Sequence, residues 1–470
     1  MMVTNTVSGS RSDDDAQPYA LAFFRIIFGL LMLVAELRFI DRGWVTSFYV
    51  KPQFFFTFYG FDWITPLPEP YMHWVFYGLV ILSCLITLGL VYRFAIITFF
   101  LAFTYVELLD KSVYLNHYYQ VSLLAFLMCW FPMNRVFSLD SLLQRKFSFY
   151  KLSSLSFTPF SSAPRQLFTL LYNPVWALRL QVGSVYFFGG IAKLKYDWLF
   201  MAQPLRIWLA ANEHLPLVGP LLTEKWVAFL LSWLAMIFDL SAPFLLSFRK
   251  TRLPVYCVIV IFHLLTHFLF YIGMFPWMMI FTALIYFPPS VYKRLLTSFS
   301  TAEMHTATFN KRISVLRFPI GPARFVLPAF FLIQLLLPFR SHLYAGNVLW
   351  HEQGFRFSWN IMLMEKNASI EYIIKVKKTG QEFTVKPSRF LTRIQARQMS
   401  FQPDMIVQFA HYLHQYYLKN GLGNTEIRAE CYASLNGRGS ALLIDPTVDL
   451  AKEKDGFQPK TWVTSLNDQP

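Results

Sequence analysis

The sequence predicts an α-helical polytopic membrane protein of about nine transmembrane helices, followed by an extracytoplasmic α+β, β-rich domain. Of the 470 residues, 55% are hydrophobic and 19% aromatic, whereas only 15% are charged. Soluble globular domains do not normally have this composition. Long apolar runs recur up to residue 340, and the pattern changes beyond it. We therefore assign a transmembrane domain to residues 1–340 and an extracytoplasmic domain to residues 341–470.

The candidate spans are apolar runs close to the ~20 residues that cross a bilayer. They cover residues 20–40, 71–91, 94–109, 119–133, 168–191, 226–247, 254–271, 274–290 and 324–340. Two runs, 94–109 and 119–133, are short, so the number of spans could differ by one or two.

The loop charges predict the orientation, because Lys and Arg collect on the cytoplasmic side of a membrane. With a cytoplasmic N-terminus, the inner loops contain Arg93, Arg145, Arg249 and Lys293, and the outer loops contain far fewer cations. An odd number of spans then places the chain after residue 341 outside the cytosol. We expect a multi-pass protein of the bacterial inner membrane, or of the endoplasmic reticulum in a eukaryotic host.

The last part of the chain has the patterns of a soluble domain. The segment "ASIEYIIKVKKTGQEFTV" alternates like two strands around a Thr-Gly turn, and "PDMIVQFAHYLHQYYLKN" has helical periodicity. The segment "ECYASLNGRGSALLID" predicts a hairpin about Asn436 and Gly437. Earlier in the chain, "SSLSFTPFSSAPRQ" is typical of a linker.

Several common chemistries are excluded. A lipid bilayer accounts for the apolar runs, so the net charge of +15 does not indicate a nucleic-acid partner. Neither the cysteine spacing nor the His and Cys spacing predicts a disulfide framework or a metal site. We find no Walker loop, dinucleotide fingerprint or serine nucleophile elbow.

Ionisable residues inside the spans are costly and usually face the protein interior. They are Arg25, Glu36, Arg38, Arg179, Asp239, His263 and His267. We interpret the arginines and carboxylates as members of structural ion pairs. The two histidines share one helix face, but no third metal ligand is evident, so we expect them to form structural hydrogen bonds.

Three residues form a more specific candidate site. Asn116 and His117 begin the fourth span on the outer side, and Lys193 ends the fifth span on that same side. A lysine in an apolar setting loses solvation of its ammonium form, which favours the neutral amine that can act as a base. The alternative is a lysine that anchors the helix at the headgroups, an interpretation that suits Lys195 better.

Six segments, in order along the chain, have a combined likeness to one family. They are "LDKSVYLNHYYQVSLLAFLMCWFP", "YFFGGIAKLKYDWL", "FDLSAPFLL", "FHLLTHFLFYIGMF", "FRFSWNIML" and "LIDPTVDL". Together they resemble the vitamin K-dependent gamma-glutamyl carboxylase family, including bacterial relatives with the horizontally transferred transmembrane (HTTM) domain. The likeness extends from about residue 20 to the C-terminus.

The resemblance implies an enzyme of the carbon–carbon lyase class. Lys193 would deprotonate vitamin K hydroquinone (reduced menaquinone or phylloquinone), assisted by Asn116 and His117. Reaction with O2 would then give a base strong enough to take the γ-proton of a glutamate in a peptide or protein, after which CO2 adds and the quinone leaves as its 2,3-epoxide. No metal is implied. The implied substrate-binding residues are Phe357, Ser358, Trp359, Met362 and His263.

The segment "FRFSWNIMLM" departs from the "YGYSWDMMVH" of the animal enzymes, with Phe355, Asn360 and Met364 in place of Tyr, Asp and His. Three hypotheses follow. The chain is a full carboxylase, or a vitamin K hydroquinone epoxidase of the same fold without protein carboxylation, or a non-enzymatic membrane scaffold or transporter. The presence of Lys193, Asn116 and His117 argues against the last.

Overall fold

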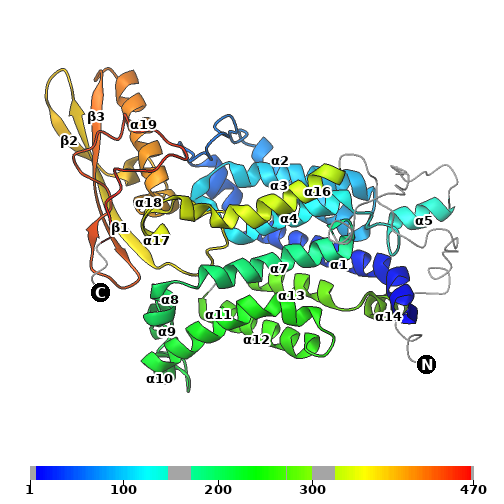
Figure 1. Cartoon of the computed structure of the whole chain (residues 1–470). Helices are drawn as coiled ribbons and strands as arrows, with labels where there is room; N and C mark the ends of the chain where they lie inside the picture. Colours follow the sequence, from blue (N-terminus) through cyan, green and yellow to red (C-terminus); the bar gives the residue numbers. More distant parts are fainter. Residues whose placement is uncertain (1–6, 147–170, 271, 299–322, 467–470) are drawn as a thin grey trace.

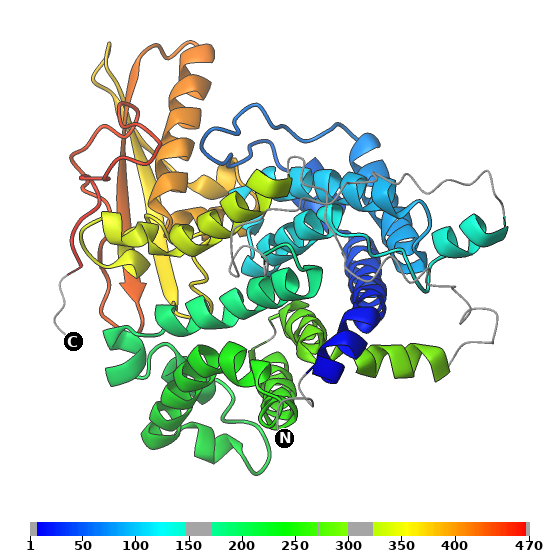
Figure 2. The same ribbon diagram turned by 45° about the vertical axis from the view of Figure 1, so that its right-hand side comes forward.

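The computed structural model describes residues 7–146, 171–270, 272–298 and 323–466. Long helices run roughly side by side through the middle of the molecule, and a small sheet with its own helices lies at one end (Figure 1). Turning the molecule by 45° keeps the sheet and α19 (Pro403–Lys419) together beside the helical part (Figure 2). The expected linker "SSLSFTPFSSAPRQ" lies outside the described residues.

Each of the nine expected spans coincides with a helix. The matching helices are α1 (Val7–Asp41), α2 (Tyr71–Leu88), α3 (Tyr92–Leu108), α4 (Asn116–Trp130), α7 (Pro174–Ala192), α11 (Lys225–Ser247), α12 (Arg252–Phe270), α13 (Phe275–Ala283) and α16 (Ala323–Leu336). Among the described residues, six segments are long and apolar enough to cross a membrane, those in α1, α2, α7, α11, α12 and the α16 region.

The other three helices are shorter. α3 has 17 residues and α4 has 15. α13 has 9 residues and continues as a 3-10 turn, η3 (Leu284–Tyr286). Pro288 and Pro289 follow, which explains why the expected span 274–290 does not form one helix: proline lacks the N–H that the helical ladder needs. α4 and α13 are mostly buried within the helical domain, whereas α3 also has an exposed face with Phe94, Ile97 and Leu101.

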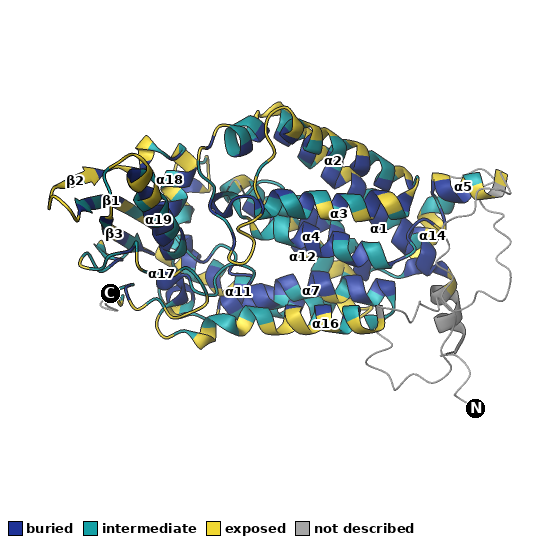
Figure 3. Ribbon diagram, turned by 90° about the horizontal axis from the view of Figure 1, so that it is seen from above, coloured by how far each residue is buried: buried dark blue, intermediate teal, exposed yellow. Residues whose placement is uncertain are grey.

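The outer faces of the helices carry the exposed residues. Figure 3 shows yellow, exposed positions along α2 and α16 and mostly buried positions along α7. The exposed positions include large apolar side chains such as Ile81, Phe325 and Leu332. In water such a surface would be unfavourable, whereas against lipid tails it is expected. The burial pattern therefore agrees with a membrane-embedded helical domain.

The sheet of the second domain has the strand order β2-β1-β3-β4, and every pair is antiparallel. The strands are β1 (Lys366–Val376), β2 (Glu382–Val385), β3 (Thr425–Leu435) and β4 (Ala441–Leu442). The predicted strand pair around Thr379-Gly380, the helix α19 and the hairpin at Asn436-Gly437 are confirmed. Asn436 and Gly437 have φ values of 52° and 82°, as a tight hairpin turn requires.

Shorter helices complete the chain. Between α4 and α7 lies α5 (Leu139–Lys146), and α14 (Pro289–Ser298) follows η3. α8 (Tyr196–Phe200), α9 (Leu205–Ala210) and α10 (Gly219–Leu222) connect α7 to α11. α17 (Val348–His351) and α18 (Arg393–Ser400) belong to the second domain.

The two ends of the helical domain differ as the loop charges predict, with basic residues at one end and the sheet-containing domain at the other. α5 and α14, which contain Arg145, Lys146, Lys293 and Arg294, lie at the end opposite the sheet, near the N-terminus (Figure 1). The basic loops and the soluble domain are therefore on opposite sides. This arrangement is the one that an extracytoplasmic second domain requires.

Two arginines of the spans donate to backbone carbonyls, and for Arg25 no ion pair of the kind that the sequence suggested is found among the described residues. Arg25 is fully buried and donates to the carbonyl oxygens of Met133 at 3.1 Å and Ile86 at 2.7 Å. Arg179 donates to the carbonyl oxygens of Ile285 at 2.9 Å and Phe287 at 3.1 Å. The physical reason is that carbonyls at and just beyond helix ends have no partner within a helix, so they can accept hydrogen bonds from a guanidinium.

Candidate functional site

Lys193 owes its position to both ends of α7. At the start, the side chain of Asn173 accepts from the backbone N–H groups of Val175 and Trp176, and Pro174 occupies the first turn. Near the end, a Cβ on Gly190 would lie 2.7 Å from the backbone nitrogen of Leu240 in α11. Glycine therefore allows α7 and α11 to approach closely just before the lysine.

The amine of Lys193 is buried and has a carboxylate partner. Its Nζ atom lies 2.8 Å from Oδ2 of Asp239 in α11 and 3.3 Å from the carbonyl oxygen of Gly189. It also lies 5.4 Å from the centre of the Trp198 ring. The lysine is 5% exposed. The ion pair expected for Asp239 is confirmed, and its partner is the candidate base, which the sequence did not predict.

The amine and the carboxylate face a largely apolar space of about 350 Å³, here called the base cavity. Its lining includes Lys193, Asp239, His263, Phe275 and Met362. His263 is buried, and its Nε2 atom lies 3.1 Å from the hydroxyl of Tyr186. The expected hydrogen bond of His263 is therefore present, while its Nδ1 atom has no protein partner among the described residues.

One side of the base cavity is made of residues that also face the outside of the helical domain. Leu234 of α11 and Ile261 and Leu265 of α12 line the cavity and are 51%, 58% and 53% exposed. In a membrane these faces of α11 and α12 meet lipid tails. The cavity therefore lies beside the lipid phase as well as beneath the second domain.

Asn116 and His117 line a second space, of about 740 Å³, here called the junction cavity because both domains form its wall. Ile394 and Gln398 of α18 contribute from the second domain. The carboxamide oxygen of Asn116 accepts from the hydroxyl of Tyr114 at 3.1 Å. The structure thus places Asn116 and His117 in the cavity next to that of Lys193, not in the same one.

The two cavities adjoin. Ile272, Phe275, Ile361 and Met362 line both of them. The ring centroid of Phe275 lies 6.1 Å from that of His117 and 6.1 Å from that of His263. The Phe275 ring is therefore equally close to the imidazole of His117 in the junction cavity and to that of His263 in the base cavity.

The segment 355–362 supplies part of this shared wall. Of its predicted substrate-binding residues, Met362 lines both cavities, whereas Phe357, Ser358 and Trp359 line neither. Phe357 packs on Tyr114 and Tyr119. The segment is strained, because Phe357, Trp359 and Met362 have φ values of 62°, 54° and 55°.

Contacts around the segment hold this strained backbone in place. The buried Trp359 ring lies 5.2 Å from the ring of Tyr119. The hydroxyl of Ser358 donates to the carbonyl oxygen of Gly354 at 2.7 Å, and the backbone N–H of Phe357 donates to the Tyr114 hydroxyl at 3.0 Å. Since the same hydroxyl bonds Asn116, Tyr114 links the segment to the start of α4.

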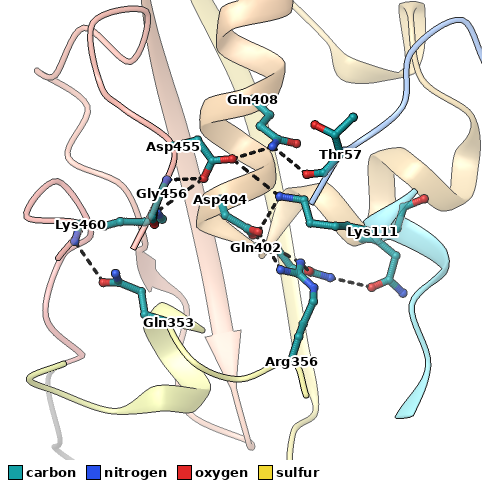
Figure 4. Close-up of polar contacts among 12 residues, drawn as sticks. Thr57, Lys111, Gln353, Arg356, Gln402, Asp404, Gln408, Asp455, Gly456 and Lys460 are labelled. Carbon is teal, nitrogen blue, oxygen red and sulfur yellow. Dashed lines mark hydrogen bonds and ion pairs between the residues drawn. The ribbon is translucent and has the colours of Figure 1, made fainter. Parts of the chain in front are cut away.

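A charged network anchors the segment to both domains (Figure 4). Asp404, at the start of α19, lies 2.7 Å from Nη1 of Arg356 and 2.8 Å from Nζ of Lys111, which belongs to the 3-10 turn η2 (Lys111–Val113) before α4. Burial alone would raise the pKa of Asp404, but the charges of Arg356 and Lys111 outweigh it and hold this pKa well below its usual range.

Sequence reasoning missed one intramembrane carboxylate. Glu107, near the end of α3, lines a third and smaller cavity together with Glu36, Arg38 and His117. The signal was present, because Glu107 lies within the expected span 94–109. Glu36 and Arg38 are each expected from the sequence to belong to an ion pair, but neither forms one within 4 Å among the described residues. Among the described residues, no three His, Cys, Asp or Glu side chains gather as a metal site would need.

Comparison with known families assigns both parts of the chain. Residues 14–290 match the model of the HTTM domain. Residues 322–469 match the model of the lumenal domain of vitamin K-dependent gamma-carboxylase. No solved structure matches the chain. The first match covers the helices from α1 to α13, and the second covers α16 and the sheet-containing part.

Proposed function

The chain belongs to the vitamin K-dependent gamma-carboxylase family, and we propose that it couples the oxygenation of vitamin K hydroquinone to the carboxylation of glutamate in a peptide or protein. The observation that carries this proposal is the Lys193–Asp239 pair in an apolar cavity beside the cavity of Asn116 and His117. The family supports vitamin K use and a glutamate-containing substrate. The epoxidation chemistry, the use of O2 and CO2 and the residue roles are our proposal.

The base cavity fits a lipid-borne quinol. Its wall is apolar apart from a few groups, and among these the unpartnered Nδ1 atom of His263 and the amine of Lys193 can meet ring hydroxyls. The lipid-facing wall at Leu234, Ile261 and Leu265 suits an apolar tail. When bound and oxygenated, the quinol supplies the strong base that removes the γ-proton of glutamate.

Asp239 changes how Lys193 can act. A carboxylate at 2.8 Å stabilises the ammonium form and opposes the desolvation that favours the neutral amine. We therefore assign the base function to the pair. Nζ of Lys193 takes a proton from the quinol hydroxyl while passing one of its own to Oδ2 of Asp239. The lysine remains an ammonium ion, and its counter-ion becomes the deprotonated quinol instead of the aspartate.

The remaining residues separate and orient the reactants. The side chain of Asn116 is held by Tyr114, so its amide is fixed at the start of α4. His117 faces the junction cavity, through which the glutamate approaches. Phe275 and Met362 form the partition between that cavity and the base cavity. A partition of apolar side chains limits the entry of water, which would otherwise protonate the strong base.

The proposal is tested by measuring two products in one reaction. Purified protein in lipid nanodiscs receives vitamin K hydroquinone, O2, labelled bicarbonate and a glutamate pentapeptide. We expect epoxide and acid-stable label in the peptide, both lost in Lys193→Ala. Epoxide without label identifies a quinol epoxidase. The absence of both products from folded protein, with the quinol still bound, would sink the enzymatic proposal and leave a scaffold or transporter.

A further inference from the structure

The junction cavity has a positively charged wall. Arg38, in the last turn of α1, and Arg42, just after it, both line this space. The other ionisable groups of the described lining are His117, His267 and the tyrosines at 49, 114 and 118, and none of the described lining residues is Asp or Glu. The junction cavity thus presents two cations and no acidic lining residue, while Arg38 also lines the neighbouring smaller cavity of Glu36 and Glu107.

The two guanidinium groups lie close to the same aromatic ring. The Cζ atoms of Arg38 and Arg42 are 5.4 Å and 5.1 Å from the centre of the Trp44 ring. Each gains a cation–π contact, but the two like charges repel each other. Arg42 is exposed and Arg38 half-buried, so water solvates both groups in the free protein, and an anion that enters the cavity can meet the two guanidinium groups together.

Neither arginine has a carboxylate partner within 4 Å among the described residues. The contrast with Arg25 and Arg179 is informative, because those guanidinium groups are directed at helix carbonyls. Arg356 is likewise paired with Asp404. Arg38 and Arg42 therefore differ from these arginines in having donors available to a ligand.

Arg38 and Arg42 lie close to the proposed reaction site, and this position limits the kinds of anion that they could bind. The cavity of Arg38 and Arg42 also contains Asn116 and His117, and it meets the base cavity at Phe275 and Met362. An anion held by the arginines would lie in the space next to Lys193. A wall contributed by Gln398 of the second domain shows that the space is not simply the headgroup layer beside a helix end.

We propose that Arg38 and Arg42 bind the side-chain carboxylate of the acceptor glutamate. This inference rests on the proposed function and names the residues that recognise its acceptor. A guanidinium offers paired N–H donors that match a carboxylate. The carboxylate is attached to the carbon that loses a proton, so a cation beside it also stabilises the negative charge that develops there.

A pair of arginines also suits the product. When the C–H bond of the γ-carbon breaks, the proton goes to the base formed by quinol oxygenation, and a new C–C bond forms to CO2. The γ-carbon then bears two carboxylates. Two guanidinium groups can take one carboxylate each, so we expect the pair to bind the carboxylated peptide at least as well as the substrate.

The test compares kinetic constants and direct binding in the full chain in nanodiscs. Arg38→Gln and Arg42→Gln should each raise the KM for a glutamate pentapeptide by about tenfold, and the double variant by more. The KM for vitamin K hydroquinone should stay unchanged. Arg38→Lys, which keeps the charge, should recover part of the loss. Arg249→Gln, which changes an exposed arginine just after the C-terminal end of α11, is the matched control.

Direct binding supplies a readout that does not need turnover. A fluorescent glutamate pentapeptide should bind the unmodified chain more tightly than its glutamine analogue, and this preference should disappear in Arg42→Gln. Should Arg38→Gln fail to fold, Arg38→Lys and Arg42→Gln still decide the question. Unchanged peptide KM and binding in folded variants, or a loss of activity that only anionic lipid restores, would overturn the inference and indicate a headgroup contact instead.

The inference and the proposed function fail in different ways. If the unmodified chain forms no carboxylated peptide, the proposed function fails before any arginine is changed. If the unmodified chain carboxylates normally and the arginine variants keep the same peptide KM, only the present inference is lost.

Discussion

The Nζ atom of Lys193 lies 2.8 Å from the Oδ2 atom of Asp239, at the contact between α7 and α11, and the two side chains are only 6% and 9% exposed. A buried pair of this kind is stable only while both charges are present, because the loss of one leaves the other unpaired in a medium of low polarity. A proton transfer to or from either side chain of this pair would therefore also change how well the two side chains are held in place.

The first prediction concerns the base itself. Lys193→Ala should abolish epoxide formation, whereas Lys195→Ala should keep it within about threefold, since Lys195 is not among the base-cavity residues. Small primary amines added to Lys193→Ala should restore part of the rate, and the pH optimum of the rescued reaction should follow the pKa of the added amine. Near-normal epoxidation by folded Lys193→Ala would contradict the base assignment and favour the alternative that Lys193 anchors the helix at the lipid headgroups.

The second prediction concerns its partner. Asp239→Asn should lower the turnover number for epoxide formation by about 10²-fold, because the amide cannot accept the proton that Lys193 passes on. The double variant Lys193→Ala/Asp239→Asn should be no slower than Lys193→Ala, as expected for residues that act as a unit. Additive losses in the double variant would show that the two side chains act independently. Asp239→Glu, which keeps the charge, is the matched variant.

The third prediction concerns the partition between the cavities. Phe275→Ala should join them and admit water to the base, so that epoxide is still formed but less carboxylated peptide is made per epoxide. The product ratio should fall severalfold relative to the unmodified chain. Phe281→Ala, on the same helix but outside the base and junction cavities, is the control. An unchanged ratio in Phe275→Ala would mean that this ring does not separate the reactants.

The fourth prediction concerns Asp404 and pH. Asp404→Asn should destabilise the folded protein at pH 7 by about 3 kcal/mol, because Arg356 and Lys111 lose their shared carboxylate. The folded pKa of Asp404 lies below its unfolded value, so the contribution of its charge is complete above about pH 5 and declines as the pH falls below about 4.

Thermal unfolding of the unmodified chain and Asp404→Asn at pH 7 and pH 3 measures this effect. The difference in the free energy of unfolding between the unmodified chain and Asp404→Asn should be smaller at pH 3 than at pH 7. The exposed pair of Glu371 and Lys386, 3.5 Å apart, provides the control Glu371→Gln, for which we expect at most about 1 kcal/mol. If this difference in the free energy of unfolding were the same at both pH values, the role assigned to the Asp404 charge would be contradicted.

The fifth prediction concerns topology. Thr379, exposed in the turn between β1 and β2, should react as Thr379→Cys with a membrane-impermeant maleimide in intact cells. Arg249→Cys, at the other end of the helical domain, should react only after permeabilisation. Both variants are made in a background without the exposed Cys257. The reverse pattern would place the second domain in the cytosol.

Local patterns predicted much of the fold. Apolar runs located the nine helices that match the expected spans because a membrane span needs a continuous apolar stretch, and the alternating pattern located β1 and β2. The end of α7 at Lys193 was also predictable, since the apolar run stops there. What local patterns could not predict is which helix ends meet in space.

The missing information concerned tertiary contacts. Asp239 is 46 residues from Lys193, and their meeting depends on the close approach that Gly190 permits. The carbonyl partners of Arg25 leave no trace in sequence, because every residue carries a carbonyl group. The separation of Lys193 and His117 into two cavities likewise depends on side chains from distant parts of the sequence, such as Phe275 and Met362, whose meeting no periodicity encodes.

Ile361 and Met362 complete the wall of both cavities, yet they lie in the part of the chain that matches the lumenal domain and not in the HTTM domain. An ancestor that possessed the first module alone would have had a base cavity open at this point. The part that matches the lumenal domain therefore supplies side chains to the proposed site itself, and both parts of the chain are needed to close it. We expect that fusing residues 14–290 to an unrelated soluble domain would remove α16, leave both cavities open at Ile361 and Met362 and abolish the proposed chemistry.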